Sequence, residues 1–132
     1  MTYLTIFLFF LVKHTICDLM LQGTWRLRAN KTPYIRSPRA HGHYLDHGIG
    51  TILLLLWFCN PYIALCVGIV DYIAHWHIDW FKSNFIEWSG WRFPTPGFWW
   101  LQALDQTLHF VTYYIFTVYL VDNGLIDVTI LL

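Results

Sequence analysis

Residues 71–82 read Asp71-Tyr-Ile-Ala-His75-Trp-His-Ile-Asp79-Trp-Phe-Lys82. Within this apolar stretch, Asp71, His75 and Asp79 recur at every fourth position. Residues four apart share one face of an α-helix, so a single helix presents three potential metal ligands in one direction. An ionisable side chain at the middle of a bilayer costs roughly 2.5–3.5 kcal/mol, which is why such residues indicate function. The stretch therefore predicts an apolar helix with a ligand-bearing face.

The same spacing recurs in three other segments of the chain. Five of the seven histidines have a His or Asp four residues away, where chance would give roughly one or two. We predict that these groups form one metal site, with His75 as its best single ligand. The glycines at 42, 48 and 50 weaken the case for His43 and His47, and His41 could replace His43. The predicted ligands are His14, Asp18, His43, His47, Asp71, His75, Asp79, Asp105 and His109.

The composition places these residues in a membrane. Hydrophobic residues make up 57% of the 132-residue chain, aromatic residues 20% and charged residues only 12%, whereas about 25% charged is usual in soluble domains. The zero net charge argues against a nucleic-acid partner, because no basic stripe is present. We expect Cys17, Cys59 and Cys66 to be buried reduced thiols, since they are odd in number and lie in apolar stretches.

Four apolar segments predict an all-α protein, a four-helix transmembrane bundle that forms a single membrane domain over residues 1–132. The expected spans are about residues 2–22, 43–59, 61–81 and 99–121, and the second is short for a bilayer crossing. Residues 88–100 carry four of the eight tryptophans, which is typical of an interfacial aromatic segment before the fourth helix. The tail after residue 124 is too short to cross and is expected to lie on the membrane or against a partner.

The basic residues predict the orientation. Seven of the eight Lys and Arg fall in the two loops that such a bundle places on one side: Arg26, Arg28, Lys31, Arg36, Arg39, Lys82 and Arg92. The positive-inside rule makes this side cytoplasmic and leaves both termini outside the cytoplasm. At 1.5 Å per residue, all nine ligand candidates then lie within a band of roughly 15 Å. We interpret Lys82 and Arg92 as interfacial residues with snorkelling stems, and phosphate binding is the alternative. His77, which has no partner four residues away, is expected to face headgroups or a neighbouring helix.

Zinc is the expected ion, because it accepts both imidazole nitrogen and carboxylate oxygen. One or two ions are consistent with nine candidates, and manganese or iron are the alternatives. With two ions, a carboxylate would have to bridge them, and Asp71, Asp79 and Asp105 are the candidates. Asp79 and Asp18 are the candidates for a catalytic general base. A di-iron oxygenase is disfavoured because Glu-x-x-His motifs are absent.

Three motifs resemble a family of small phage and bacterial membrane proteins of unknown function. They are His14-x3-Asp18, with Gln22 and Lys31 after it; Asp71-x3-His75-x2-Ile-Asp79-x2-Lys82; and Asp105-Gln-x2-His109. The resemblance covers about residues 5–116, and it extends more distantly to membrane-bound metal-dependent hydrolases of bacterial inner membranes. It implies a metal site and a multi-pass protein of the bacterial or host inner membrane, and it does not imply a substrate.

The leading hypothesis is a metal-dependent hydrolase at the cytoplasmic membrane face, with a lipid phosphoester as the candidate substrate and membrane lipid as a partner. One alternative is a metal-stabilised structural or pore subunit of a phage or membrane assembly. Another is an ion or proton transporter, since His and Asp residues line such pathways. The transport hypothesis is weakened by the clustering of the candidates in one half of the bilayer. The sequence is also consistent with a homo-oligomer.

Overall fold

The computed structural model describes residues 2–24, 30–34 and 37–127. These residues form α1 (Thr2–Thr15), a π-helix η1 (Ile16–Leu21), the short α2 (Gln22–Thr24), α3 (Pro38–Leu55), α4 (Pro61–Ser89) and α5 (Pro96–Asp122), and the described part of the chain contains no strand. The expected all-helical architecture is confirmed. Arg26, Arg28 and Arg36, which contributed to the predicted orientation, lie outside the described residues, as does the end of the tail.

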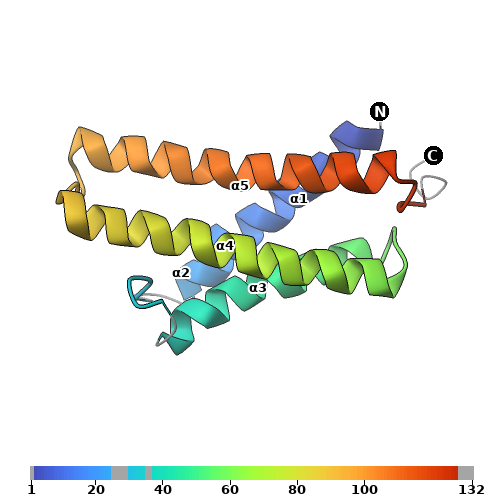
Figure 1. Ribbon diagram of the computed structural model, residues 1–132, viewed down its shortest axis with the longest axis horizontal. Coiled ribbons are helices and arrows are strands. Elements are labelled where there is room, and N and C mark those ends of the chain that lie inside the picture. The colour runs from blue at the N-terminus through green and yellow to red at the C-terminus, as the bar shows by residue number, and fades with distance from the viewer. Residues whose placement is uncertain (1, 25–29, 35–36, 128–132) are drawn as a thin grey trace.

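The α4–α5 hairpin forms one layer, and α1 and α3 cross beneath it (Figure 1). Both described ends of the chain lie at one end of the bundle, together with the α3–α4 turn. The Tyr3 hydroxyl donates to the carboxylate of Asp122, and the backbone N–H of Asp127 donates to the carbonyl of Phe58 at 2.7 Å. The α4–α5 turn lies at the opposite end.

Proline and short polar side chains determine where the helices begin. α3, α4 and α5 each have proline in the first turn, where its missing N–H would have no intrahelical partner. The Asn60 side chain caps α4 by accepting from the N–H of Tyr62 at 2.8 Å, and Gly90 ends α4 with a φ of +69°. Only residues 90–95 separate α4 from α5, so most of the expected interfacial segment 88–100 is helical.

Two glycines allow α3 and α4 to pack closely. A Cβ added to Gly68 would lie 2.8 Å from the carbonyl oxygen of Gly48 and 2.4 Å from Cγ1 of Ile52. Glycine weakens an isolated helix by roughly 1 kcal/mol, but here the missing side chain lets the two backbones meet. α3 begins at Pro38, five residues before the expected start of the second span. It continues through Gly42, Gly48 and Gly50 to Leu55, and Gly48 makes the close contact with α4.

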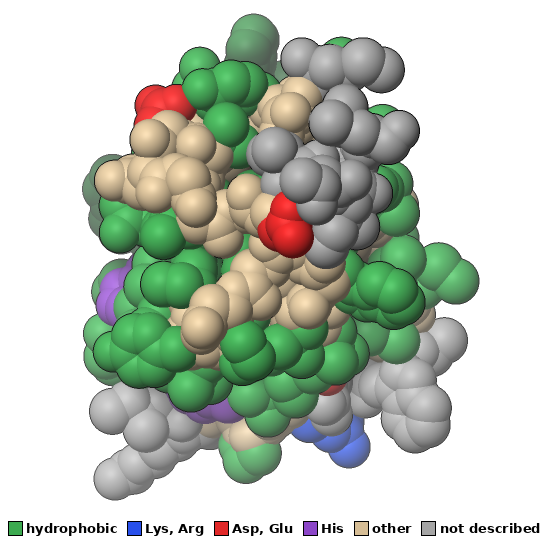
Figure 2. Space-filling view, turned by 90° about the vertical axis from the view of Figure 1, so that its right-hand side faces the viewer, with side chains coloured by type: hydrophobic (Ala, Val, Ile, Leu, Met, Phe, Trp, Pro, Cys, Tyr) green, Lys and Arg blue, Asp and Glu red, His purple; other side chains and the backbone are tan. Residues whose placement is uncertain are grey.

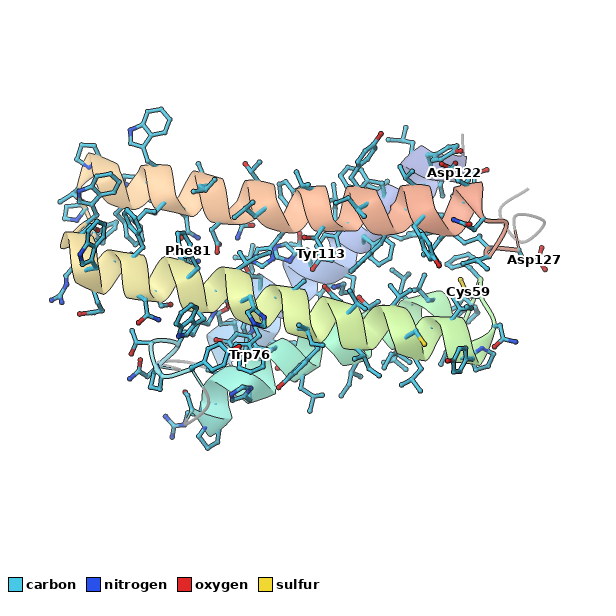
Figure 3. All side chains as sticks on the ribbon, viewed as in Figure 1. Cys59, Trp76, Phe81, Tyr113, Asp122 and Asp127 are labelled. Carbon is cyan, nitrogen blue, oxygen red and sulfur yellow. The ribbon has the colours of Figure 1, made fainter. Side chains whose placement is uncertain are left out.

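The interior is divided into an apolar half and a polar half. The apolar core lies toward the end that carries the chain termini and consists of Ile6, Phe10, Leu55, Ala64, Val67, Tyr113, Phe116, Leu120 and Ile126. Tyr113 of α5 (Figure 3) stacks on Phe10 of the apolar core and accepts from Lys13 of the polar half, so it lies where the two halves meet. The polar half is built mainly from buried charged and imidazole side chains: Lys13, His14, His43, His47, Asp71, His75, Asp79, Asp105 and His109.

The outer surface is strongly apolar. Leu4 is 72% exposed, Leu19 71% and Trp100 74%. At the end that carries the chain termini, hydrophobic side chains surround a central area of backbone and polar atoms (Figure 2). Among the described helices, one continuous segment, Thr2–Leu21, is long and apolar enough to cross a membrane by length and composition. The four-span prediction is thus not confirmed on this criterion. The His and Asp residues of α3, α4 and α5 lower the mean hydropathy of those helices.

Candidate metal centre

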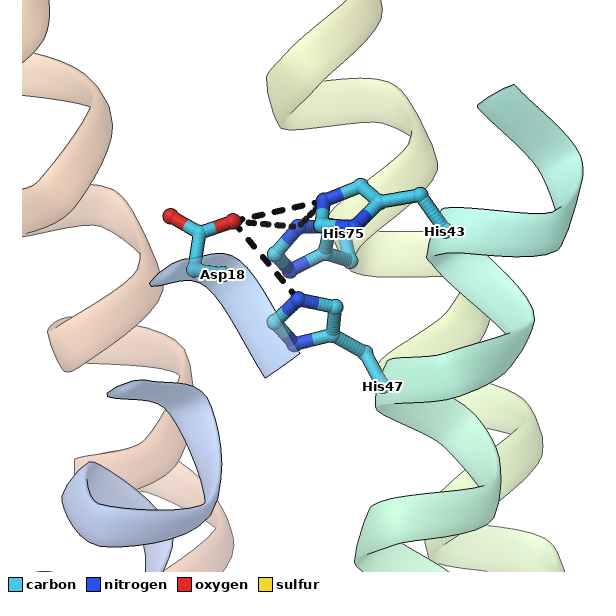
Figure 4. Close-up of side chains that lie close together, drawn as sticks. All are labelled: Asp18, His43, His47 and His75. Atoms are coloured by element: carbon cyan, nitrogen blue, oxygen red, sulfur yellow. Dashed lines mark hydrogen bonds and ion pairs between the residues drawn. The ribbon is translucent and has the colours of Figure 1, made fainter. Parts of the chain in front are cut away.

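Four side chains from three segments converge in the polar half of the bundle. Asp18 comes from η1, His43 and His47 come from α3, and His75 comes from α4 (Figure 4). Each offers one ligand atom, and the four atoms all lie within 4.8 Å of one another. We call these four residues the first ligand group.

The distances within the first ligand group suit a small tetrahedral ion. Asp18 Oδ1 lies 3.3 Å from His43 Nε2, 3.7 Å from His47 Nε2 and 3.9 Å from His75 Nε2. The Nε2 atoms of His43 and His75 are 3.2 Å apart. Ligands about 2.0–2.1 Å from a tetrahedral zinc ion would themselves be separated by about 3.3 Å. The residues therefore fit a bound zinc ion without a large rearrangement.

Buried imidazole nitrogens without partners support the same conclusion. Among the described residues, Nε2 of His47 is fully buried and accepts or donates no hydrogen bond. An unsatisfied buried polar atom costs about 1–3 kcal/mol. The ring of His75 is stacked between those of His47 and His109, with centroids 3.5 and 4.0 Å away. A cation at the ring edge, in line with the in-plane lone pair of His47 Nε2, would satisfy this free nitrogen.

The three buried aspartates and the half-buried Asp18 differ in how their charge is balanced. Asp71 pairs with Lys13 at 2.8 Å, Asp105 pairs with Lys82 at 2.7 Å, and Asp79 pairs with Lys31. Within the described parts of the chain, Asp18 has no Lys or Arg at ion-pair distance; its carboxylate faces imidazoles and accepts from Gln106 Nε2 at 3.2 Å. The carboxylate of the first ligand group is thus the one that still needs a cation.

The local backbone around Asp18 is unusual. Asp18 lies in the π-helix η1, which interrupts the regular helix after α1. Such π-turns are frequent at functional sites because the extra residue re-aims the side chains. Here His14 remains beside the group, with Nε2 3.7 Å from Asp18 Oδ2, and its two nitrogens contact Gln106 and Tyr113 at 3.2 Å each.

A second cluster adjoins the first. His75, Asp79 and His109 also offer ligand atoms within 4.8 Å of one another. Asp79 Oδ2 lies 3.4 Å from His43 Nε2 and 3.5 Å from His75 Nε2, and its Oδ1 lies 3.9 Å from His109 Nε2. Asp105 Oδ1 is 3.7 Å from the same nitrogen of His109. Eight of the nine predicted ligands therefore lie in or beside one of the two clusters.

Asp71 is the predicted ligand that lies neither in nor beside the two clusters. Its Oδ2 accepts from Lys13 at 2.8 Å and from the Thr51 hydroxyl at 2.6 Å. Lys13 also donates to the Tyr113 hydroxyl at 3.0 Å, and this hydroxyl lies 3.5 Å from His47 Nδ1. Asp71 thus belongs to a polar network behind the ligand groups, where it balances Lys13.

The lysines are the residues that the sequence analysis missed or misjudged. Lys82 does not snorkel to an interface: its ammonium group faces Asp105, and its side chain is 17% exposed. The three-residue spacing from Asp79 to Lys82 could have indicated that Lys82 lies on the ligand-bearing face of α4, where its Nζ is 3.9 Å from Asp79 Oδ1. Lys13 lies at the end of an apolar run and directly before His14, a position that could likewise have indicated a buried lysine near the ligands. Arg92 is exposed and pairs with Glu87 at 2.8 Å.

The two remaining questions about histidine are answered by the contacts. His43 is buried in the first ligand group, whereas His41 lies outside it with Nδ1 2.9 Å from the Tyr72 hydroxyl. His77 is exposed and contacts the Tyr34 hydroxyl at 3.0 Å, so it faces a neighbouring segment. Cys17, Cys59 and Cys66 are free thiols, but only Cys17 is fully buried.

Comparison with known proteins gives a family without an assigned activity. No curated protein and no solved structure shows a significant match to this chain. The sequence model of the family described as "Protein of unknown function (DUF3307)" matches residues 6–130. This match spans nearly the whole chain and includes every residue of both clusters, and the protein is therefore a member of the DUF3307 family.

Proposed function

We propose that the protein is a membrane-embedded, metal-dependent hydrolase whose ion is held by Asp18, His43, His47 and His75. The observation that carries the proposal is the convergence of these four ligand atoms around a carboxylate that lacks a lysine partner in the described residues. Three imidazole nitrogens and one carboxylate oxygen are a donor set that zinc accepts. Zinc is the proposed ion.

The distribution of side chains supports a multi-pass membrane location. Three aspartates, five imidazoles and Lys13 are buried inside the bundle, and large apolar side chains cover much of the outside. This is the arrangement expected where lipid replaces water as the solvent. α4 has 29 residues and α5 has 27, so at 1.5 Å per residue each exceeds the roughly 30 Å hydrocarbon core. We propose four spans in a bacterial inner membrane, with both termini outside the cytoplasm.

An anionic lipid is the proposed substrate class. Lys31 and Lys82 are the lysines beside the clusters, with side chains 10% and 17% exposed, and Asp18 is 17% exposed beside them. These groups form the accessible side of the site and are suited to a phosphate. A groove of about 420 Å³ between α1–η1 and α3, lined by apolar residues such as Phe9, Ile16 and Leu53, is suited to an acyl chain.

The proposed reaction is hydrolysis of a phosphoester. A zinc ion, when bound, would lower the pKa of a water molecule to about 7 and polarise a phosphoryl oxygen. Asp79 Oδ2 is next to the ligand nitrogens of His43 and His75, so Asp79 is the proposed acceptor for the proton of the attacking water. The water oxygen bonds to phosphorus, the ester P–O bond breaks, and the proton passes to the departing alcohol.

The metal is tested with a matched pair of histidine variants. We expect protein purified in detergent to contain at least one zinc ion per chain by elemental analysis. His43→Ala should lower zinc affinity by more than the roughly 10–100-fold that loss of a ligand's hydrogen-bond partner costs. His41→Ala is the control, because His41 lies outside both clusters. Metal content far below one ion per chain in the wild type, or equal loss in both variants, would overturn the proposal.

The reaction is tested with Asp79→Asn. We expect wild-type protein to cleave a p-nitrophenyl phosphodiester or vesicle phospholipid, and Asp79→Asn to keep the first ion and the fold but lose turnover. A p-nitrophenyl carboxylate ester tests the acyl alternative. No cleavage of any of these probes by zinc-loaded wild-type protein would reject the hydrolase proposal.

One observation favours a structural metal as the second candidate. Asp18 and the three histidines supply four ligands, and structural zinc sites are usually closed by four protein ligands. In that case, loss of any one ligand lowers zinc content and thermal stability together, and Asp79→Asn has no specific effect. A transporter is less well supported, because the buried apolar core closes the far half of the described bundle.

A further inference from the structure

We propose that the bundle holds a second divalent ion beside the first, bound by Asp79 from α4 and by Asp105 and His109 from α5. Binding of this ion does not depend on hydrolase activity, so the proposal goes beyond the proposed function. The ligand atoms are Oδ1 of Asp79, Oδ1 of Asp105 and Nε2 of His109. We call these three residues the second ligand group.

Two of these atoms are buried and have no partner. Among the described residues, Asp105 Oδ1 and His109 Nε2 are fully buried side-chain atoms without a hydrogen bond. Their residues are only 3% and 2% exposed, and the two atoms are 3.7 Å apart. A hydrogen bond between them would require a shorter distance. A cation between them would satisfy both a lone pair of the imidazole and a lone pair of the carboxylate.

Asp79 supplies the third atom because its two oxygens face different ways. Lys31 donates to Oδ2, which also lies near the first ligand group. Within the described residues, the ion-pair contacts of Oδ1 are long, at 3.9 Å from both His109 Nε2 and Lys82 Nζ. Oδ1 is therefore available to the second ion, while Oδ2 keeps its position beside the first.

His75 belongs to the first ion rather than to both. Its Nε2 atom is the one that approaches Asp18, His43 and Asp79, and one imidazole nitrogen has a single lone pair. The second ion must therefore take another ligand, and Asp105 Oδ1 is an unpartnered atom of the described residues that lies 3.7 Å from His109 Nε2. Two carboxylate oxygens and one imidazole nitrogen suit Mn²⁺ or Zn²⁺.

Lys82 determines how tightly the second ion binds. Its ammonium donates to Asp105 Oδ2 at 2.7 Å and leaves Oδ1 of the same carboxylate free. Lys31 and Lys82 already neutralise Asp79 and Asp105, whereas no lysine or arginine of the described segments pairs with Asp18 in the first ligand group. The second ion therefore binds more weakly than the first, and removal of the Lys82 charge strengthens its binding.

The experiment is a metal titration of the whole protein in detergent. Protein stripped with a chelator is titrated with Zn²⁺ and, separately, with Mn²⁺, and the stoichiometry is measured by calorimetry and elemental analysis. We expect two Zn²⁺ ions per chain, one tight and one weak. His109→Gln and Asp105→Asn should each reduce this number to one, and His41→Gln should leave it at two. Two Mn²⁺ ions should show a spin-coupled paramagnetic resonance spectrum that is absent from His109→Gln.

Lys82→Gln provides a test that does not depend on a loss of function. This change removes a positive charge beside the second ligand group, so the weaker ion should bind on the order of tenfold more tightly. One ion per chain in wild-type protein, unchanged in His109→Gln and in Lys82→Gln, would overturn the proposal. Two ions without cleavage of any probe would reject the hydrolase and leave the second ion standing, and cleavage with one ion would do the reverse.

Discussion

At the residue scale, the three buried aspartates and the half-buried Asp18 have different roles because of their neighbours. Asp71, Asp79 and Asp105 each lie against a lysine. Asp18 instead faces the imidazoles of His14, His43, His47 and His75. A buried carboxylate must be neutralised or hydrogen-bonded to stay charged. The lysine-paired aspartates are already balanced, and among the described residues Asp18 is the aspartate of the ligand groups without a lysine or arginine partner.

The pair of Lys13 and Asp71 is predicted to be a strong determinant of folding. Its side chains are 7% and 2% exposed, and Nζ lies 2.8 Å from Oδ2. Lys13→Met leaves the Asp71 charge buried without its partner, so we expect a loss of about 3–5 kcal/mol in the free energy of unfolding. The double change Lys13→Met with Asp71→Leu removes both charges and should recover most of this loss. Unfolding in detergent, followed by circular dichroism, measures both.

Arg92→Gln is the matched control for this prediction. It breaks the pair with Glu87, whose side chains are 66% and 57% exposed. Exposed ion pairs contribute about 0–1 kcal/mol, so stability should hardly change. Equal effects of Lys13→Met and Arg92→Gln would show that the buried pair contributes nothing beyond a surface contact.

At the element scale, the contact between α3 and α4 positions three of the four first-group ligands. His43 and His47 lie on α3, and His75 lies on α4. The helices approach through Gly48 and Gly68, each of which would bring an added Cβ within 3 Å of the other's carbonyl oxygen. Since Gly48 follows His47 directly, the spacing of the two backbones also sets the spacing of the ligand nitrogens.

Gly68→Ala is therefore predicted to affect both stability and metal binding. The new methyl group would lie 2.8 Å from the Gly48 carbonyl oxygen. This oxygen belongs to the backbone of α3, so it cannot move away as the end of a flexible side chain could. We expect a loss of about 1–3 kcal/mol and weaker zinc binding, measured by thermal unfolding with and without the metal. Gly23→Ala is the control, because an added Cβ there meets nothing within 4 Å. Unchanged zinc affinity in Gly68→Ala would show that the close contact between α3 and α4 does not position the ligands.

At the scale of the whole molecule, the bundle has two distinct ends. The chain termini and the α3–α4 turn lie at one end, beside the apolar core, and the α4–α5 turn lies at the other. In a membrane this arrangement defines an orientation. The polar half with its ligand groups then lies nearer to the side that carries the α4–α5 turn.

Cysteine labelling is predicted to report this orientation. In a chain whose native cysteines are replaced by serine, Arg92→Cys should react with an impermeant thiol reagent only from the cytoplasmic side. Asn123→Cys, after the end of α5, should react from outside. Positive residues favour the cytoplasmic side of the membrane, which is the physical reason for the expected direction. Labelling of Arg92→Cys from outside intact cells would reverse the topology.

The sequence by itself determined the helices and the residues that they carry. Proline at the first turns, Gly90 after α4 and long apolar runs act locally, so the helical architecture could be predicted from composition and spacing. The four-residue repeats likewise identified eight residues that the structure places in or beside the two clusters. The helix α3 begins five residues before the expected second span, and residues 96–100 belong to α5. Pro38 and Pro96 mark these helix starts, because proline is favoured in the first turn.

Only the tertiary structure decided which of these residues meet. Asp71 and His75 share one face of α4, yet His75 joins the first ligand group and Asp71 contacts Lys13 of α1. The sequence pattern also left His41 and His43 as alternatives, and Lys82 as an interfacial residue. Spacing along a helix fixes a direction, but distances between helices depend on their crossing and relative height, which arise from contacts such as Gly48 with Gly68. For that reason the ligand-bearing faces could be predicted from the sequence, whereas the division into two ligand groups with their lysine partners could not.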